Sequence, residues 1–242
     1  RTLFPYTTLF RSSFFDFEII EKIKTEDKKV YKLFVVAVAK ERIERLLELA
    51  KKLDLKLGCI DMASNCIARV FKNVHKIDKK IGEFGILTIG KHSSSFILID
   101  SGKPFIERKV PFDIKNVLSE ITKIKAISEE AAQNYLEHSY DFNDAKLEDE
   151  LNSKIAAHFD NVFFTYERVI QFYTNGKIKK SLDKIFILTD GMTLNNIDKY
   201  VENYFSTDTQ MINSQLSLMI NTKFPAGCDF SEYINCLGIL LR

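Results

Sequence analysis

The sequence predicts an α/β protein in which strands and helices alternate along the chain. Short apolar runs such as FGILTIG and SSSFILID lie between polar turns, and stretches with apolar residues three and four positions apart follow them. The 242 residues are enough for one large domain or two small ones. Hydrophobic residues at 45% and charged residues at 28% are ordinary globular values, which exclude disordered and collagen-like proteins.

Charge and cysteine content exclude further classes. The net charge of +2 is small, and the lysines alternate with acids in KERIERLLELAKKLDLK, so we expect no nucleic-acid partner. Histidines and cysteines lack the spacing of metal ligands, and we expect no metal site. The cysteines lie in apolar stretches and are expected to be buried, free thiols in a reducing compartment. They are Cys59, Cys66, Cys228 and Cys236.

The first residues do not read like the rest of the chain. Residues 2–12, TLFPYTTLFRS, resemble the conceptual translation of a sequencing adapter, and they lack the basic and long apolar regions of a signal peptide. We expect residues 1–13 to be a non-native leader that packs poorly, ahead of a chain whose natural N-terminus is missing. An edge strand broken by Pro5 is the alternative.

The next part, residues 14–80, begins with two β-rich runs, FFDFEIIEKIK and VYKLFVVAVAK, which predict a hairpin. An amphipathic helix is expected over KERIERLLELAKKL, then a short strand over LKLGCIDM and a helix over ASNCIARVFKNV. The helical stripe of the first helix consists of Ile43, Leu46, Leu47 and Leu53. The polar connector HKIDKKIGE follows.

The remainder, residues 81–242, opens with three strand signals, the last two joined by a turn at Ser101 and Gly102. Helices are expected over IKNVLSEITKIK, over SEEAAQNYLEHS with a capped start at Ser128, and from about residue 151 to 174. The aromatic run FFTYERVIQFY of the long helix is expected to pack in the core. A buried strand in LDKIFILTDGMT, a helix over LNNIDKYVENYF and an apolar terminal helix complete the chain.

Three motifs in this order resemble the actin-like ATPases. They are LTIGKHSSSFILID, the long helix ending in YERVIQFY, and IFILTDGMTLNNIDKYV. In that superfamily the first turn holds phosphates and the last cradles adenosine, and glycine lets the backbone approach the ligand. From residue 14 onward the chain is similar to PilM-type type IV pilus assembly proteins, including the terminal CLGILLR.

The resemblance implies a partial actin-like (RNase H-like) fold with an inserted subdomain and its first strands missing. Residues 14–80 would be the remnant of the first lobe with that insertion, and residues 81–242 the second lobe. It also implies a nucleotide pocket, with no catalytic residue and no protein metal ligand. The expected pocket residues are Thr88, Gly90, Ser93, Ser94, Arg168 and Gly191.

This pocket departs from the family pattern. Thr88 replaces an aspartate that would organise magnesium, Thr165 replaces a glutamate near the ribose, and DGM replaces a triple glycine. Asp190 would repel a polyphosphate by several kcal/mol at about 4–5 Å and an effective dielectric near 20. The run of serines at residues 93–95 is equally consistent with an exposed hairpin. We therefore expect a degenerate site that does not hydrolyse ATP.

The resemblance implies a cytoplasmic scaffold, peripheral to the bacterial inner membrane, that binds the N-terminal segment of a PilN-like membrane protein through residues 14–74. ATP with magnesium would be a cofactor only if the pocket were active. Three alternatives remain: an active ATP-binding ATPase, a GspL-like secretion scaffold and an FtsA-like division protein. Binding of ATP to the full-length protein would separate the first alternative from the scaffold.

Overall fold

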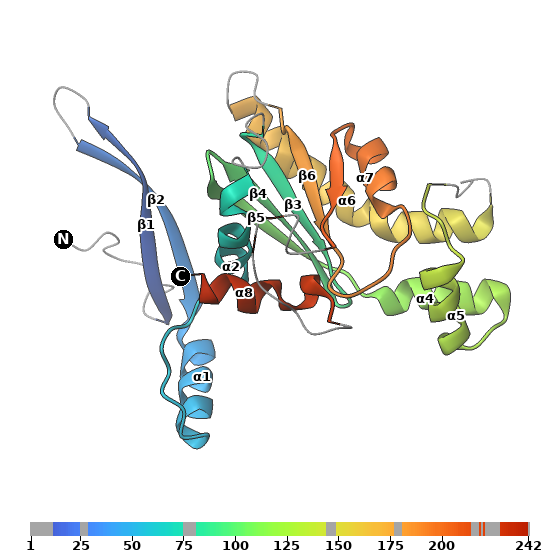
Figure 1. The fold of residues 1–242 in the computed structure, drawn as a ribbon, viewed down its shortest axis with the longest axis horizontal. Coiled ribbons are helices and arrows are strands. Elements are labelled where there is room, and N and C mark those ends of the chain that lie inside the picture. Colours follow the sequence, from blue (N-terminus) through green and yellow to red (C-terminus); the bar gives the residue numbers. More distant parts are fainter. Residues whose placement is uncertain are drawn as a thin grey trace. The chain divides into compact units, whose positions relative to one another are not determined.

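The fold was analysed in a computed structural model, which describes residues 12–24, 29–74, 81–143, 149–176, 181–213, 218, 220 and 228–241. Contacts divide the chain into two compact units, residues 1–61 and 62–242 (Figure 1). Residues 1–11 of the expected leader and residues 75–80 of the connector lie outside the described residues. The assignment of lobes at residues 80 and 81 stays a prediction.

The first unit is a two-stranded antiparallel ribbon followed by one helix, as predicted. Its elements are β1 (Ser13–Lys24), β2 (Lys29–Ala39) and α1 (Lys40–Lys52). No described side chain of this unit is fully buried, and the apolar stripe of α1 contributes no buried residue. The strand expected over LKLGCIDM is wrong, because residues 55–62 form no ladder with any described strand.

The second unit is built on a mixed five-stranded sheet in the order β5-β4-β3-β6-β7. The predicted strands form as expected: β3 (Phe84–Ile89), β4 (Ser93–Asp100), β5 (Lys103–Pro111) and β6 (Lys184–Leu188). Ser101 and Gly102 both have positive φ, which fits a tight two-residue hairpin turn. The short edge strand β7 (Thr209–Met211) was not predicted, since three residues carry no periodicity.

Helices cover both faces of this sheet (Figure 1). Side chains alternate between two cores, so that Leu87 and Ile187 face one helical layer while Ile86 and Phe186 face the other. The first layer holds α4 (Ile114–Lys125), α5 (Glu129–His138), α6 (Glu150–Gly176) and α7 (Ile197–Phe205). The second holds α2 (Ala63–Val70), η2 (Phe71–Asn73), η4 (Phe230–Tyr233) and α8 (Ile234–Leu240).

Two sequence expectations about burial need correction. On α6 the helical period buries Phe163, Tyr166 and Tyr173 but leaves Phe164 and Phe172 58% and 65% exposed. All four cysteines are free thiols, but only Cys66 is buried. Cys236 is exposed because it lies on the side of α8 that faces away from the core. None of the described helices is long and apolar enough to cross a bilayer.

Candidate functional site

The carboxyl ends of β3 and β6 lie side by side, because these strands run parallel with Thr88 opposite Leu188. Each strand leads into a glycine turn, at Gly90 and at Gly191. A methyl group placed on Gly90 would lie 3.2 Å from Oδ2 of Asp190, so the two turns are in close contact. In open α/β sheets ligands bind at this edge. The structure therefore brings together two of the glycines that the sequence singled out.

The first turn directs its polar groups inward. The Gly90 amide donates to the carbonyl of Ser93 at 3.0 Å, and the Ser94 hydroxyl donates to the carbonyl of Thr88 at 2.8 Å. Ser94 is only 1% exposed. The buried hydroxyl of Thr88 has no hydrogen-bond partner among the described residues. Neither Gly90 nor Ser94 thus offers a free donor to a phosphate, which such a turn would need.

A backbone hydrogen bond and one exposed pair of side chains tie the tip of the same turn to the start of α4. The Ile114 amide donates to the carbonyl of Lys91 at 3.0 Å, and His92 lies 3.7 Å from the carboxylate of Asp113. Asp113 also caps α4 by accepting from the Lys115 amide. His92 is exposed. The turn is held by the helix that follows β5.

The second turn has left-handed backbone at both Asp190 and Gly191, with φ of 50° and 78°. The Gly191 amide donates to the hydroxyl of Ser231 at 2.9 Å. Ser231 in turn donates to Asp229, from its amide and from its hydroxyl, at 2.6 Å each. A methyl group placed on Gly191 would lie 2.7 Å from Cγ and Cδ of Glu232. The backbone surface that Gly191 exposes is thus covered by η4.

Sequence reasoning missed Asp229, which caps η4, and the η4 residues Ser231 and Glu232. The run DFSEY has the Asp-x-Ser spacing of a capped helical start, and that signal could have identified Asp229 and Ser231 as a cap. Nothing in the sequence placed them beside residue 191, because the contact spans 40 residues.

Arg168 does not join the site. It is exposed on α6, and no hydrogen bond or ion pair within the described part of the chain connects it to either turn. Tyr166, two residues earlier on α6, is buried and stacks on Phe96 of β4 with ring centroids 5.5 Å apart. Burial raises the pKa of Tyr166, and the neighbouring Ser94 hydroxyl opposes this rise. The helix therefore packs against β4 through a buried aromatic side chain.

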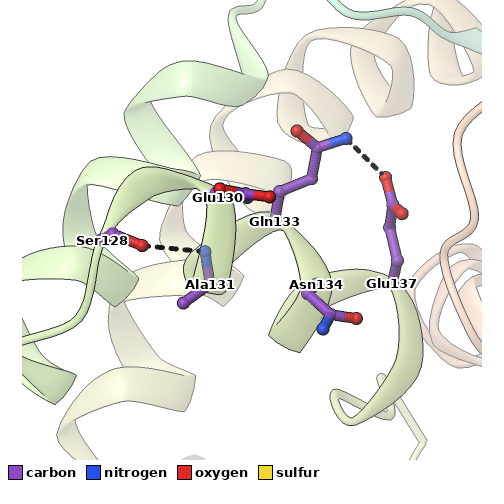
Figure 2. A pocket seen from close by; sticks show the side chains of 6 residues that line it. All are labelled: Ser128, Glu130, Ala131, Gln133, Asn134 and Glu137. Carbon is purple, nitrogen blue, oxygen red and sulfur yellow. Dashed lines mark hydrogen bonds between the residues drawn. The ribbon is translucent and has the colours of Figure 1, made fainter.

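Surface pockets lined by described residues also lie elsewhere in this unit. One, of about 500 Å³, follows α5 and is lined by polar side chains that bond to one another, as Gln133 does with Glu137 (Figure 2). At its start Ser128 accepts from the Ala131 amide, which confirms the predicted cap. The other pocket lies beside Asn195, whose side-chain amide donates to the carbonyl of Glu137 in α5 and to that of Tyr140 just after this helix. The part of the chain that the structure describes holds no cluster of three or more metal-binding side chains.

Comparison with known proteins decides the family. The family model described as "Type IV pilus assembly protein PilM" matches residues 5–233. The chain belongs to this PilM family. No curated protein sequence matches the chain.

Solved structures agree with a PilM-type actin-like fold. A structure described as the PilM-PilN type IV pilus biogenesis complex matches with a TM-score of 0.65 at 16% identity, covering 96% of this chain and 66% of that one. MreB 5 of Spiroplasma citri bound to AMPPNP matches with a TM-score of 0.59 at 16% identity, and the match covers 84% of this chain and 64% of that one. The ethanolamine utilization protein EutJ from Carboxydothermus hydrogenoformans matches with a TM-score of 0.51 at 13% identity, and the match covers 84% of this chain and 62% of that one. This PilM-family chain thus spans slightly less than two thirds of each relative.

Proposed function

We propose that this chain acts as an actin-like scaffold of the type IV pilus assembly platform. In this role it binds the N-terminal segment of a PilN-like inner-membrane protein on the cytoplasmic side, and that partner holds it at the membrane. The observation that carries the proposal is the family match over residues 5–233. The likeness to a chain of a PilM-PilN complex, over 96% of this chain, supports the partner.

The ribbon of the first unit favours an apolar peptide as partner. Directly paired residues of β1 and β2 share one face, where Phe17 lies opposite Val35 and Ile19 opposite Leu33. Phe15, Phe17, Ile19 and Val35 of this face are each at least 38% exposed. Exposed apolar surface of this kind is typical of protein interaction sites.

The nucleotide site supports a scaffold without ATPase activity. Thr88 supplies a hydroxyl where the family has a carboxylate, and the amides of Gly90 and Gly191 are bonded within the chain. A phosphate at this edge would meet the carboxylate of Asp190 and find both glycine amides already engaged. We infer that partner binding does not depend on nucleotide.

Fluorescence anisotropy with a labelled N-terminal peptide of the PilN-like protein from the same genome tests this function. We expect saturable binding that Phe17→Asp weakens at least tenfold and that 1 mM Mg-ATP leaves unchanged. Phe164→Asp is the matched control, because Phe164 is similarly exposed, 58% against 54%, but belongs to the second unit. Absence of binding by the wild-type chain, or binding only with ATP, would contradict the proposal.

A further inference from the structure

Glu232 occupies the space that Gly191 leaves open. A glycine at positive φ presents a bare backbone surface to whatever approaches it. Here Cγ and Cδ of Glu232 lie 2.7 Å from the position that a side-chain carbon of Gly191 would take. The close approach permitted by this glycine is therefore already used by a side chain of the same protein.

The segment that carries Glu232 is fixed in place. Phe230 and Ser231 are buried, and the Ser231 hydroxyl joins the Asp229 carboxylate to the Gly191 amide. η4 continues into α8, whose Gly238 lies against the backbone of Cys66 in α2. Glu232 is thus presented to the turn by a short helix that is anchored at both ends.

Asp190 covers the other glycine. Its Oδ2 lies 3.2 Å from where a side-chain carbon of Gly90 would be. The two glycine surfaces at the ends of β3 and β6 are each covered by a carboxylate from this chain. Any anionic ligand placed on either surface would meet both a filled volume and a like charge.

We propose that Glu232, together with Asp190, fills the ligand space of this site and excludes nucleotide from it. The inference rests on the proposed function, in which the site is a degenerate nucleotide pocket. Glu232 acts mainly through its volume, because its carboxylate group and its Cγ both lie against Gly191. Asp190 acts mainly through its charge.

Isothermal titration calorimetry with Mg-ATP on the full chain tests the inference. We expect no heat of binding from the wild type at 1 mM nucleotide. For the double variant Asp190→Gly, Glu232→Ala we expect binding with a dissociation constant at least tenfold below that concentration. Glu232→Gln in place of Glu232→Ala in the double variant keeps the side-chain volume and is expected to prevent nucleotide binding. Glu130→Ala, at an exposed acid on α5, is the matched control and is expected to behave like the wild type.

Urea unfolding of each variant checks that it folds, and Glu232→Ser replaces Glu232→Ala if the latter does not. If the folded double variant still binds no nucleotide, or if it binds equally well with Glu232→Gln in place of Glu232→Ala, the inference is wrong while the scaffold function stands. If the wild type itself binds Mg-ATP below 1 mM, the degenerate pocket of the proposed function is wrong as well.

Discussion

Gly238 determines how closely α2 and α8 can approach. A side-chain carbon at this position would overlap the backbone of Cys66, lying 2.6 Å from its Cα. Gly238→Ala is expected to lower the free energy of unfolding by about 1–3 kcal/mol, because two helix backbones would have to separate. Urea unfolding measures this loss. Gly58→Ala, where nothing lies within 4 Å, is the control, and an equal loss in both variants would contradict the explanation.

Ala126 adopts the left-handed conformation at the end of α4, with φ of 53° and its amide bonded to the carbonyl of Thr122. An alanine there carries a steric cost that glycine avoids. Ala126→Gly is expected to raise the free energy of unfolding by about 1 kcal/mol. Ala131→Gly, in the first turn of α5, is expected to lower the free energy of unfolding instead. A loss of stability in Ala126→Gly would contradict this reading of the cap.

At the scale of elements, a partly buried hydrogen bond joins α7 to α6. The hydroxyl of Tyr200 donates to the carboxylate of Asp160 at 2.6 Å. Burial, and then the bond to Asp160, raise the pKa of Tyr200 above its ordinary value of 10.0. Burial likewise raises the pKa of Tyr173 to about 12. Below pH 10 these phenols are protonated in both the folded and the unfolded chain.

The free energy of unfolding is therefore expected to be unaffected by these tyrosines up to about pH 10 and to fall above it, since the unfolded chain then releases protons that the folded chain retains. Tyr200→Phe is expected to cost about 1 kcal/mol at pH 7 and to make the fall between pH 10 and 11 shallower. Urea unfolding at several pH values measures both effects. An unchanged slope above pH 10 would contradict the role of Tyr200.

Local sequence signals predicted most elements because each element carries its own period. Apolar runs separated by turn residues predicted the β3–β4–β5 meander, and the turn between β4 and β5 has positive φ. The serine cap at the start of α5 was also visible in the sequence. Strand β7 forms because it pairs with β6, and residues 55–62 form no strand because they pair with none of the described strands. Such pairing between distant segments cannot be predicted from a local sequence pattern. At the candidate site the glycine turns were predictable, whereas the cover by Glu232 depends on the path of a distant segment.

Across the whole molecule, stability is concentrated in the second unit. Ile86, Leu87 and Leu98 of its sheet are fully buried, whereas no described side chain of residues 12–61 is. Amides of the antiparallel pair β3–β4 are expected to exchange with solvent only on global unfolding, and those of the pair β1–β2 at least a hundredfold faster. Hydrogen exchange followed by mass spectrometry compares the two pairs directly. Equal protection would contradict this division.

The β1–β2 ribbon has a further consequence for handling the protein. A ribbon of two strands has two edges, and neither carries another strand in the described part of the chain. Strand edges are templates on which a second polypeptide can add its own strand. Charged positions such as Glu21, Lys22 and Lys24 near the end of β1 oppose such growth. Neutralising them would make the ribbon a starting point for aggregation.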